Sequence, residues 1–382
     1  MIKEKELIRL SLFNSLIKGL DMMLVFFLAI HFTNIDLSGA QIGTIFALGS
    51  LTSILTILPS GFSSDRFNSK HLITFSLILF AIFYLGLAFT QNFYAIIALF
   101  LTGSIGKNLY TAASQSLFYK SSQNENLKKK ISVFQSLHYI AIGFAVIIAG
   151  YLLNINYTFE NLFLIISGLF LAAAITGQFI LPTNETAEFN IIHYKQDLLK
   201  PAILFFMVIV FLFSLHIGAE ITSYGLFLKE NLQLTPLNQG LYMGIAILFM
   251  ALSVSLLGKK LEHLKAKNVL LVGLFTSGLG LILMNFQNPH LSLLFRIIHE
   301  IGDSAVFFFL YYGVSKMFDL NRIGGNNGIF LLIISIGATI GAFFCSPIGE
   351  TYGYNISLIL GGATTLLACA LVVPFTHLIH HE

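Results

Sequence analysis

The sequence predicts an all-α membrane protein whose twelve transmembrane helices form two pseudo-symmetric six-helix bundles. Its 382 residues are 56% hydrophobic and 10% charged, with a mean hydropathy of +0.83. This leaves too little polar surface for a water-soluble protein of this size. Apolar stretches of about 20 residues, the length of a membrane-crossing helix, recur along the whole chain. A short pattern is also repeated between its two halves.

The apolar stretches define the twelve predicted spans in order. Residues 1–9 carry basic residues ahead of an apolar run of more than twenty residues that has no small-residue cleavage site. We therefore interpret this run as the first span and not as a secretion signal. The predicted spans are 10–32, 40–62, 71–90, 93–118, 132–154, 161–181, 201–228, 237–257, 268–286, 290–315, 328–348 and 355–376.

Lysine and arginine are distributed unequally between the two sides that these spans define. Of 21 basic residues, 17 lie in the N-terminal segment or in loops on its side of the membrane, three lie within spans, and only Lys229 lies in an opposite loop. Basic loops remain in the cytoplasm, so we expect both termini of this multi-pass protein to be cytoplasmic. Ile, Phe, Asn and Lys, which AT-rich codons encode, are frequent and favour a bacterial protein. We therefore expect it in the bacterial plasma membrane, that is, the inner membrane.

A polar interruption near the middle of the chain separates six predicted spans on each side. The segment from Gly61 to Lys70, after the second span, is matched by the segment from Gly258 to Lys267, after the eighth. Both have a glycine, an acid and two bases at identical spacing. Many transporters consist of two related halves, and this match predicts a doubled six-helix unit. The expected parts are an N-terminal bundle (1–181), a cytoplasmic loop (182–200) and a C-terminal bundle (201–382).

The first of these segments is similar to the loop motif of the major facilitator superfamily, although Asn68 stands where that family usually has glycine. Together with the six-plus-six topology, the resemblance covers the whole chain. It implies that the loop latches a cytoplasmic gate. Asp65 would contact a helix N-terminus or a base across the interface between the halves, and Arg66 would contact an acid. The expected gate residues are Gly61, Asp65, Arg66 and Lys70, with Gly258 and Glu262 in the weaker copy.

Seven charged residues lie inside predicted spans, where a charge costs about 2.5–3.5 kcal/mol and marks a functional candidate. All seven fall in spans 1, 4, 7 and 10, which line the central cavity in the family that the chain resembles. With polar neighbours at helical spacing they form one stripe on each of these spans. We expect a substrate cavity of Asn14, Lys18, Lys107, Tyr110, His216 and Arg296, and proton coupling by Asp21, Glu220, His299, Glu300 and Asp303.

Four facing stripes indicate a water-filled pocket that binds a charged solute and carries protons. Glu220 has no base within one turn of its own helix, so we expect it to protonate readily. The competing interpretation is that Lys18–Asp21 and Arg296–Glu300 are ion pairs that only hold helices together. The leading hypothesis is a secondary active transporter of a small charged or zwitterionic organic solute, coupled to protons and working by alternating access.

Other functions remain open on the same fold. His216–Glu220 and His299–Asp303 are i,i+4 pairs of a kind that binds divalent metals, so one alternative is an exporter of metals or metal chelates. Another is a multidrug efflux antiporter, although span 5 lacks the Gly-Pro ending that is typical of them. A membrane enzyme and a non-transporting receptor are weaker alternatives. We expect no enzymatic activity, cofactor, resident metal or nucleic-acid partner. The expected partners are the solute, protons and the lipid bilayer, and the expected state is a monomer.

Overall fold

The structure is a computed structural model, and it describes residues 4–122, 126–183, 200–260 and 266–374. Within these ranges the regular elements are helices, with no strand. In chain order they are α1 (Glu4–Met22), η1 (Val25–Phe27), α2 (Leu28–Asn34), α3 (Gly39–Arg66), α4 (Ser69–Phe89), α5 (Phe93–Ser121), α6 (Leu127–Asn154), α7 (Phe159–Ile180), α9 (Pro201–Leu226), η2 (Phe227–Asn231), α10 (Pro236–Lys260), α11 (Ala266–Leu283), α12 (Pro289–Met317), η3 (Leu320–Arg322), α13 (Ile323–Tyr352) and α14 (Tyr354–Val372).

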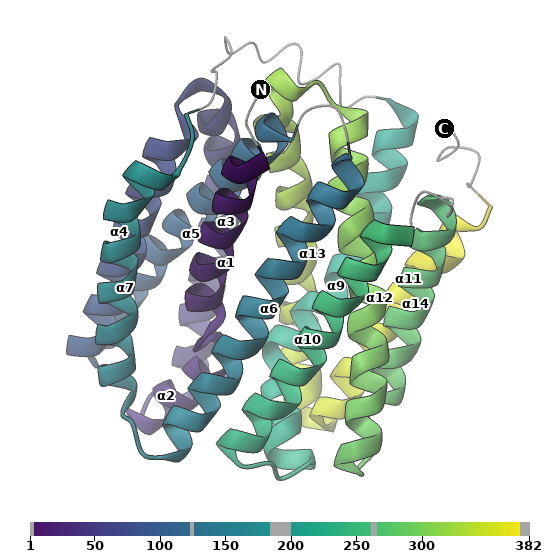
Figure 1. Ribbon diagram of the computed structural model, residues 1–382. Coiled ribbons are helices and arrows are strands. Elements are labelled where there is room, and N and C mark those ends of the chain that lie inside the picture. Colours follow the sequence, from purple (N-terminus) through teal and green to yellow (C-terminus); the bar gives the residue numbers. More distant parts are fainter. Residues whose placement is uncertain (1–3, 123–125, 184–199, 261–265, 375–382) are drawn as a thin grey trace.

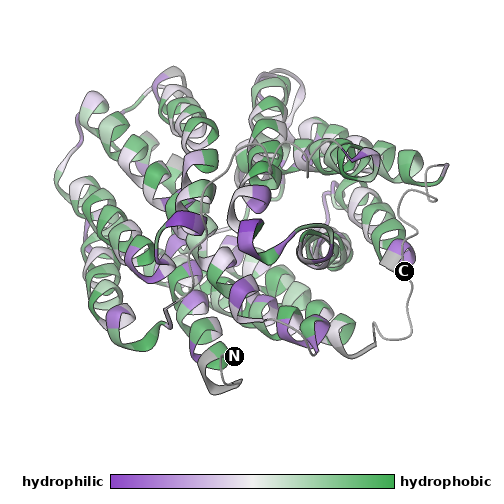
Figure 2. Ribbon diagram, turned by 90° about the horizontal axis from the view of Figure 1, so that it is seen from above, coloured by the Kyte–Doolittle hydropathy of each residue, from purple (hydrophilic) through white to green (hydrophobic). Residues whose placement is uncertain are grey.

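The helices form two bundles that lie side by side (Figure 1). In the first half, α1 packs on α6, α3 on α5, and α4 on α5 and α7. In the second half, α9 packs on α13 and α14, and α11 on α12 and α14. The start of α1 and the end of α14 lie on one face, at the top of Figure 1, which we call the terminal face. Seen from this face, much of the outer surface is hydrophobic and many hydrophilic residues gather toward the middle (Figure 2).

The described helices coincide with the predicted spans. Within the described ranges, ten helices are long and apolar enough to cross a membrane. The other two predicted spans correspond to α11 and α12. The apolar part of α11, Lys267–Leu283, is shorter. Helix α12 is 29 residues long, but it carries Arg296, Glu300 and Asp303 in its interior. The all-helical membrane class is confirmed, and α12 departs from a simple apolar composition where it carries charge.

Near the face opposite the terminal face, the first span is interrupted and the seventh changes from α- to π-helix. The sequence predicts a single run over 10–32, but α1 ends at Met22 and the chain continues through η1 into α2. Helix α9 likewise ends at Leu226 and passes into the π-helical turn η2. Hydropathy does not locate the first break because the chain stays apolar through it. Phe26 in η1 contacts Tyr224 of α9 edge-on, with 6.3 Å between ring centres, so the first and seventh spans meet across the two halves.

Two helix pairs, α6–α10 and α3–α13, join the bundles. Glycines allow a close approach in both. A Cβ atom on Gly150 of α6 would lie 3.0 Å from the Cα atom of Gly240 on α10. Where α3 ends and α13 begins, at the terminal face, a Cβ atom on Gly61 would lie 2.8 Å from the carbonyl oxygen of Gly324. Larger side chains at these positions would separate the bundles.

Candidate functional site

Six of the predicted site residues meet between α9 and α12 in the second bundle. The α9 residues lie one helical turn apart, and the stripe of α12 faces them, so periodicity within each helix gathers the side chains on one face. Five of the six residues are buried, while the side chain of Glu220 is 16% exposed. We call this group the α9–α12 cluster; its members are His216, Glu220, Arg296, His299, Glu300 and Asp303.

Arg296 is the permanent cation of the α9–α12 cluster. Its guanidinium pairs with Glu220, with one Nη2–Oε2 distance of 3.3 Å, and with Glu300, whose Oε1 atom lies 2.7 Å from Nη2. The guanidinium also lies over the ring of Tyr224, 4.1 Å from the ring centre. A planar guanidinium can hold two carboxylates and stack on an aromatic face simultaneously. The Arg296–Glu300 pair of the competing interpretation is therefore present, but it belongs to a network that extends to a second helix.

The environment of Glu220 differs from the expectation of an isolated carboxylate. Its Oε1 atom pairs with Arg296 and lies 2.9 Å from Nε2 of His299. The prediction was wrong because it considered only bases on the same helix, whereas both partners lie on α12. Glu220 is therefore a link between two helices.

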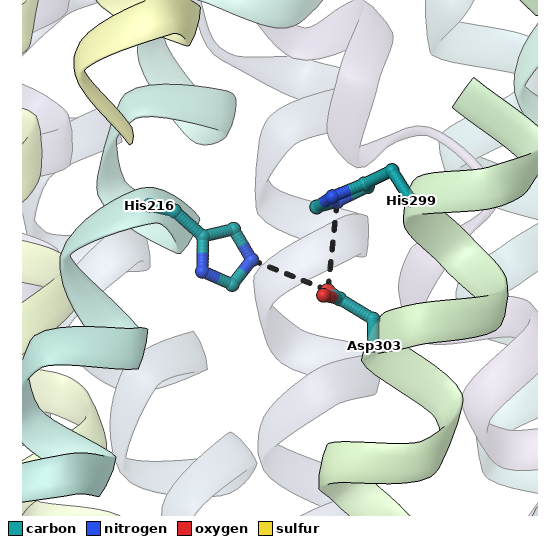
Figure 3. A group of neighbouring side chains, drawn as sticks. All are labelled: His216, His299 and Asp303. Atoms are coloured by element: carbon teal, nitrogen blue, oxygen red, sulfur yellow. Dashed lines mark hydrogen bonds and ion pairs between the residues drawn. The ribbon is translucent and has the colours of Figure 1, made fainter. Parts of the chain in front are cut away.

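Two imidazole rings converge on Asp303 (Figure 3). The Nε2 atom of His216 lies 3.2 Å from Oδ2 of Asp303, and Nε2 of His299 lies 3.6 Å from the same oxygen. The Nδ1 atom of His216 contacts the carbonyl oxygen of Phe213, and Nδ1 of His299 lies 2.8 Å from that of Ser277. A carbonyl oxygen only accepts hydrogen bonds, so each Nδ1 carries hydrogen and each ring presents Nε2 to the carboxylate.

The charges of the α9–α12 cluster do not balance when both histidines are neutral. Three carboxylates then face one guanidinium, which leaves two uncompensated negative charges in a buried site. A buried charge is costly without a counter-charge. The Oγ atom of Ser277 donates to Asp303 at 2.5 Å, but a hydroxyl group adds no charge. The site therefore favours any state in which up to two further positive charges are bound.

The predicted residues of the first bundle are arranged more sparsely. Nζ of Lys18 donates to Oγ1 of Thr111 at 3.3 Å and lies 5.5 Å from the ring centre of Tyr110. The hydroxyl group of Tyr110 donates to Oδ1 of Asn14 at 3.0 Å. Among the described contacts there is no ion pair between Lys18 and Asp21, although Asp21 is buried. Lys18 and Asp21 still attract each other along α1, but without a direct contact between these two described residues.

Lys107 is exposed and lies one turn before Thr111 on α5. This spacing places it on the same face of α5 as the hydroxyl group that binds Lys18. The first bundle thus brings two lysines toward one region, whereas Asn14 and Tyr110 are buried and bonded to each other. Their hydrogen bond orders the helix faces beside Lys18.

Asp65 joins the two bundles at the terminal face. Its carboxylate accepts hydrogen bonds from the backbone N–H groups of Gly324, at 3.0 Å, and Gly325, at 2.7 Å, in the first turn of α13. It also pairs with Nζ of Lys120 at 3.3 Å. Unpaired N–H groups and the helix dipole make a helix N-terminus attractive to a carboxylate. Arg66 instead is exposed, and its described contact is with the ring of Phe67, 5.7 Å away, so the expected acidic partner is absent from the described contacts.

The other predicted gate residues have structural contacts. Gly258 of α10 lies so close to Ser132 of α6 that a Cβ atom there would collide with it. The N–H group of Lys70 donates to the side chain of Asn68, which caps the start of α4. Glu262 lies outside the described residues.

A second polar contact joins the bundles at residues that the sequence did not single out. Nε2 of Gln115 on α5 donates to the hydroxyl group of Tyr311 on α12 at 2.7 Å, and Nδ2 of Asn327 on α13 donates to Oε1 of Gln115 at 2.5 Å. Gln115 and Tyr311 are 196 residues apart. Gly106 of the fourth predicted span and Gly302 of the tenth have the same separation, within one residue of the separation of Gly61 and Gly258. An offset of 196 between the halves is the signal that could have identified the contact, because equivalent residues of two related halves can meet on the symmetry axis.

Two helical bundles with charged side chains buried between membrane-spanning helices are typical of membrane transporters. A family model for the Major Facilitator Superfamily matches residues 11–265 and 204–381, so the chain belongs to that family. The human organic anion transporter MFSD10 (TETRAN) is similar in structure, with a TM-score of 0.74, 15% identity, and coverage of 97% of this chain and 100% of that one.

A POT family transporter in complex with a thioalcohol-conjugated peptide is also similar. Its TM-score is 0.75 and its identity 14%, with 98% of this chain and 96% of that chain covered. At such identities the likeness shows a shared fold. No curated protein matches the chain.

Proposed function

We propose that the protein is a secondary active transporter that moves a small charged or zwitterionic organic solute across the plasma membrane, coupled to protons. The observation that carries this proposal is the charge imbalance of the α9–α12 cluster, where three carboxylates, two of them buried, face one guanidinium. Protons neutralise the excess charge while the site is closed. They leave when water or a charged solute compensates it. Occupancy by protons and by solute is thereby linked.

His299 has the central position in this coupling. Its Nε2 atom lies near both Glu220 and Asp303, at 2.9 and 3.6 Å. A proton on Nε2 therefore interacts with two carboxylates on different helices. Arg296 pairs with both Glu300 and Glu220. A change of charge at one carboxylate therefore changes how strongly Arg296 binds the other. Asp21 is the corresponding candidate in the first bundle.

The solute charges are expected to divide between the bundles. Lys18 and Lys107 would attract an anionic group to the first bundle, and the carboxylates of α9 and α12 would attract an amine to the second. An organic solute agrees with the two structural neighbours, described as an organic anion transporter and as a peptide-bound transporter. Fold alone does not identify the solute.

Alternating access requires the contacts at the terminal face to break. We assign this face to the cytoplasm from the distribution of basic residues. The described state is then held closed on the cytoplasmic side by Asp65 at the N-terminus of α13 and by the Gln115–Tyr311–Asn327 contacts. Opening separates α3 from α13 and α5 from α12 as the bundles rock.

Transport into proteoliposomes tests the coupling. A thermal-shift screen of amino acids, dipeptides and organic acids would select a radiolabelled solute, and an inwardly directed or outwardly directed pH gradient would then be imposed. We expect solute accumulation in one gradient direction, abolished by a protonophore. Glu220→Gln and Glu300→Gln should lose accumulation while retaining exchange of labelled for unlabelled solute. Glu230→Gln, an exposed residue of η2, is the matched control. Solute flux that does not depend on the pH gradient and that is unchanged in both cluster variants would refute proton coupling.

Hydrogen–deuterium exchange tests the role of Asp65 in closure. Asp65→Asn removes the charge that attracts Lys120 and the α13 dipole, so exchange at Ile323–Gly328 should rise. Arg66→Gln is the neighbouring control, because Arg66 is exposed and surface charges contribute little. Equal exchange in the two variants would show that Asp65 does not hold the bundles together.

A further inference from the structure

The side chains around Asp303 offer a set of donor atoms typical of a transition-metal site. His216, His299 and Asp303 each present one ligand atom, and these atoms lie within 4.8 Å of one another (Figure 3). The Oε1 atom of Glu220 lies 2.9 Å from Nε2 of His299 and adds a fourth donor. Two imidazole nitrogens with two carboxylate oxygens form a combination that zinc-class cations bind.

Backbone carbonyl groups fix both rings in the orientation that metal binding needs. Each Nδ1–H group points at a carbonyl oxygen, that of Phe213 for His216 and that of Ser277 for His299. Metal-ligating histidines are commonly held in this way, which leaves the other nitrogen as the ligand atom. In the neutral rings each Nε2 atom is an acceptor that faces a carboxylate oxygen, also an acceptor. Nε2 of His299 faces Oε1 of Glu220 at 2.9 Å and Oδ2 of Asp303 at 3.6 Å, so a cation between these atoms would satisfy all of them.

We propose that His216, His299, Asp303 and Glu220 form a tetrahedral binding site for a divalent transition-metal cation, with Zn²⁺ as the representative ion. Donor atoms around a tetrahedral zinc ion lie about 3.4 Å apart when the bonds are about 2.0–2.1 Å long. The distances from Oδ2 of Asp303 to the two Nε2 atoms are 3.2 and 3.6 Å. These two distances, and the 2.9 Å between Nε2 of His299 and Oε1 of Glu220, are close to that spacing.

The charge of the ion matches the imbalance of the cluster. Arg296 pairs with both Glu220 and Glu300 and offsets one negative charge, so two of the three carboxylate charges in the cluster remain uncompensated. A divalent cation beside His299 supplies two positive charges where Glu220 and Asp303 approach the same imidazole nitrogen. Glu220, with its side chain 16% exposed, is the most accessible donor and gives the ion its route into the site.

All four donors belong to one bundle. Two lie on α9 and two on α12, so a bound ion does not cross the interface that alternating access opens. The site would persist while the bundles rock. The site needs neither the solute nor proton coupling. Metal binding can therefore be tested without measuring transport, and its failure would leave the proposed function untouched.

Calorimetric titration with Zn²⁺ tests the site on the full-length protein, purified without a histidine tag. The C-terminal histidines 377, 380 and 381 lie outside the described residues and could bind metal themselves. All proteins in the test therefore carry His377→Ala, His380→Ala and His381→Ala. We expect one ion per chain. His216→Gln, His299→Gln and Asp303→Asn should each weaken binding by at least the roughly 10–100-fold that loss of a supporting residue costs at metal sites.

The control is His31→Gln, which replaces another buried histidine, on α2 in the first bundle. Its Zn²⁺ affinity should equal that of the parent protein. X-ray absorption of the Zn²⁺-loaded parent gives a readout that needs no cluster variant to fold. We expect four nitrogen or oxygen ligands with scattering from two imidazole rings. Loss of all binding on replacement of the C-terminal histidines, unchanged affinity in the cluster variants, or a spectrum without two imidazoles would overturn the proposal.

Discussion

The two bundles carry their membrane charges in opposite ways. In the second bundle, the α9–α12 cluster is a continuous network in which Arg296 and two histidines contact three carboxylates. In the described part of the first bundle, Lys18 rests on a hydroxyl group and an aromatic ring and forms no ion pair. The internal offset of 196 residues makes Lys107 equivalent to Asp303. Under this offset, equivalent positions of the two halves carry opposite charges.

The difference teaches how one fold can separate two tasks. The second bundle has an excess of carboxylates and suits the storage of protons or cations. The first bundle has two lysines against Asp21 and suits contact with an anionic group. Charges within a network depend on one another, whereas a charge held by neutral groups can be removed with less disturbance. The two bundles should respond differently to neutralising substitutions.

Arg296→Met should give the largest loss of stability. It leaves Glu220 and Glu300 facing each other without their shared cation and removes the contact with Tyr224. Removing one partner of a buried ion pair costs about 3–5 kcal/mol, measurable as the free energy of unfolding in detergent micelles. Adding Glu220→Gln and Glu300→Gln to the same protein should restore much of the loss. A cost below about 1 kcal/mol for Arg296→Met would mean that the network contributes no more than surface pairs.

Tyr110→Phe should have an intermediate effect in the first bundle. It removes the hydrogen bond to Asn14 at 3.0 Å and leaves a buried amide oxygen unsatisfied, which costs about 1–3 kcal/mol. A double-mutant cycle with Asn14→Leu separates the hydrogen bond from packing. If the effects of the two substitutions on the free energy of unfolding are additive, this hydrogen bond does not order the region beside Lys18.

Lys18→Met should have the smallest effect on stability. Its ammonium group gives up one hydrogen bond to Thr111 and a distant ring contact, and replacement of a buried charge by an apolar side chain is often neutral or stabilising. We expect a change within about 1 kcal/mol, together with weaker binding of solutes that carry an anionic group. A loss as large as that of Arg296→Met would show that both bundles depend on their charges equally.

Much of the framework is readable in the sequence because it depends on local properties. Apolar length locates the spans, and the exclusion of charge from lipid makes the seven membrane charges conspicuous on four helices. The i,i+4 spacing also groups Arg296 with Glu300, and the structure shows them paired at 2.7 Å. The break after Met22 was not predicted, since the chain remains apolar through it.

The sequence by itself determined the helices, their order, the family motif after the second span and which residues carry charge in the membrane. Only the tertiary structure decided the partners of those residues. Glu220 reaches Arg296 and His299 on α12, His216 meets Asp303, and Gln115 meets Tyr311 in the other bundle. Helical periodicity places side chains on a face of their own helix. The rotation of that face toward another helix is set by packing between segments distant in the chain, and no local pattern encodes it.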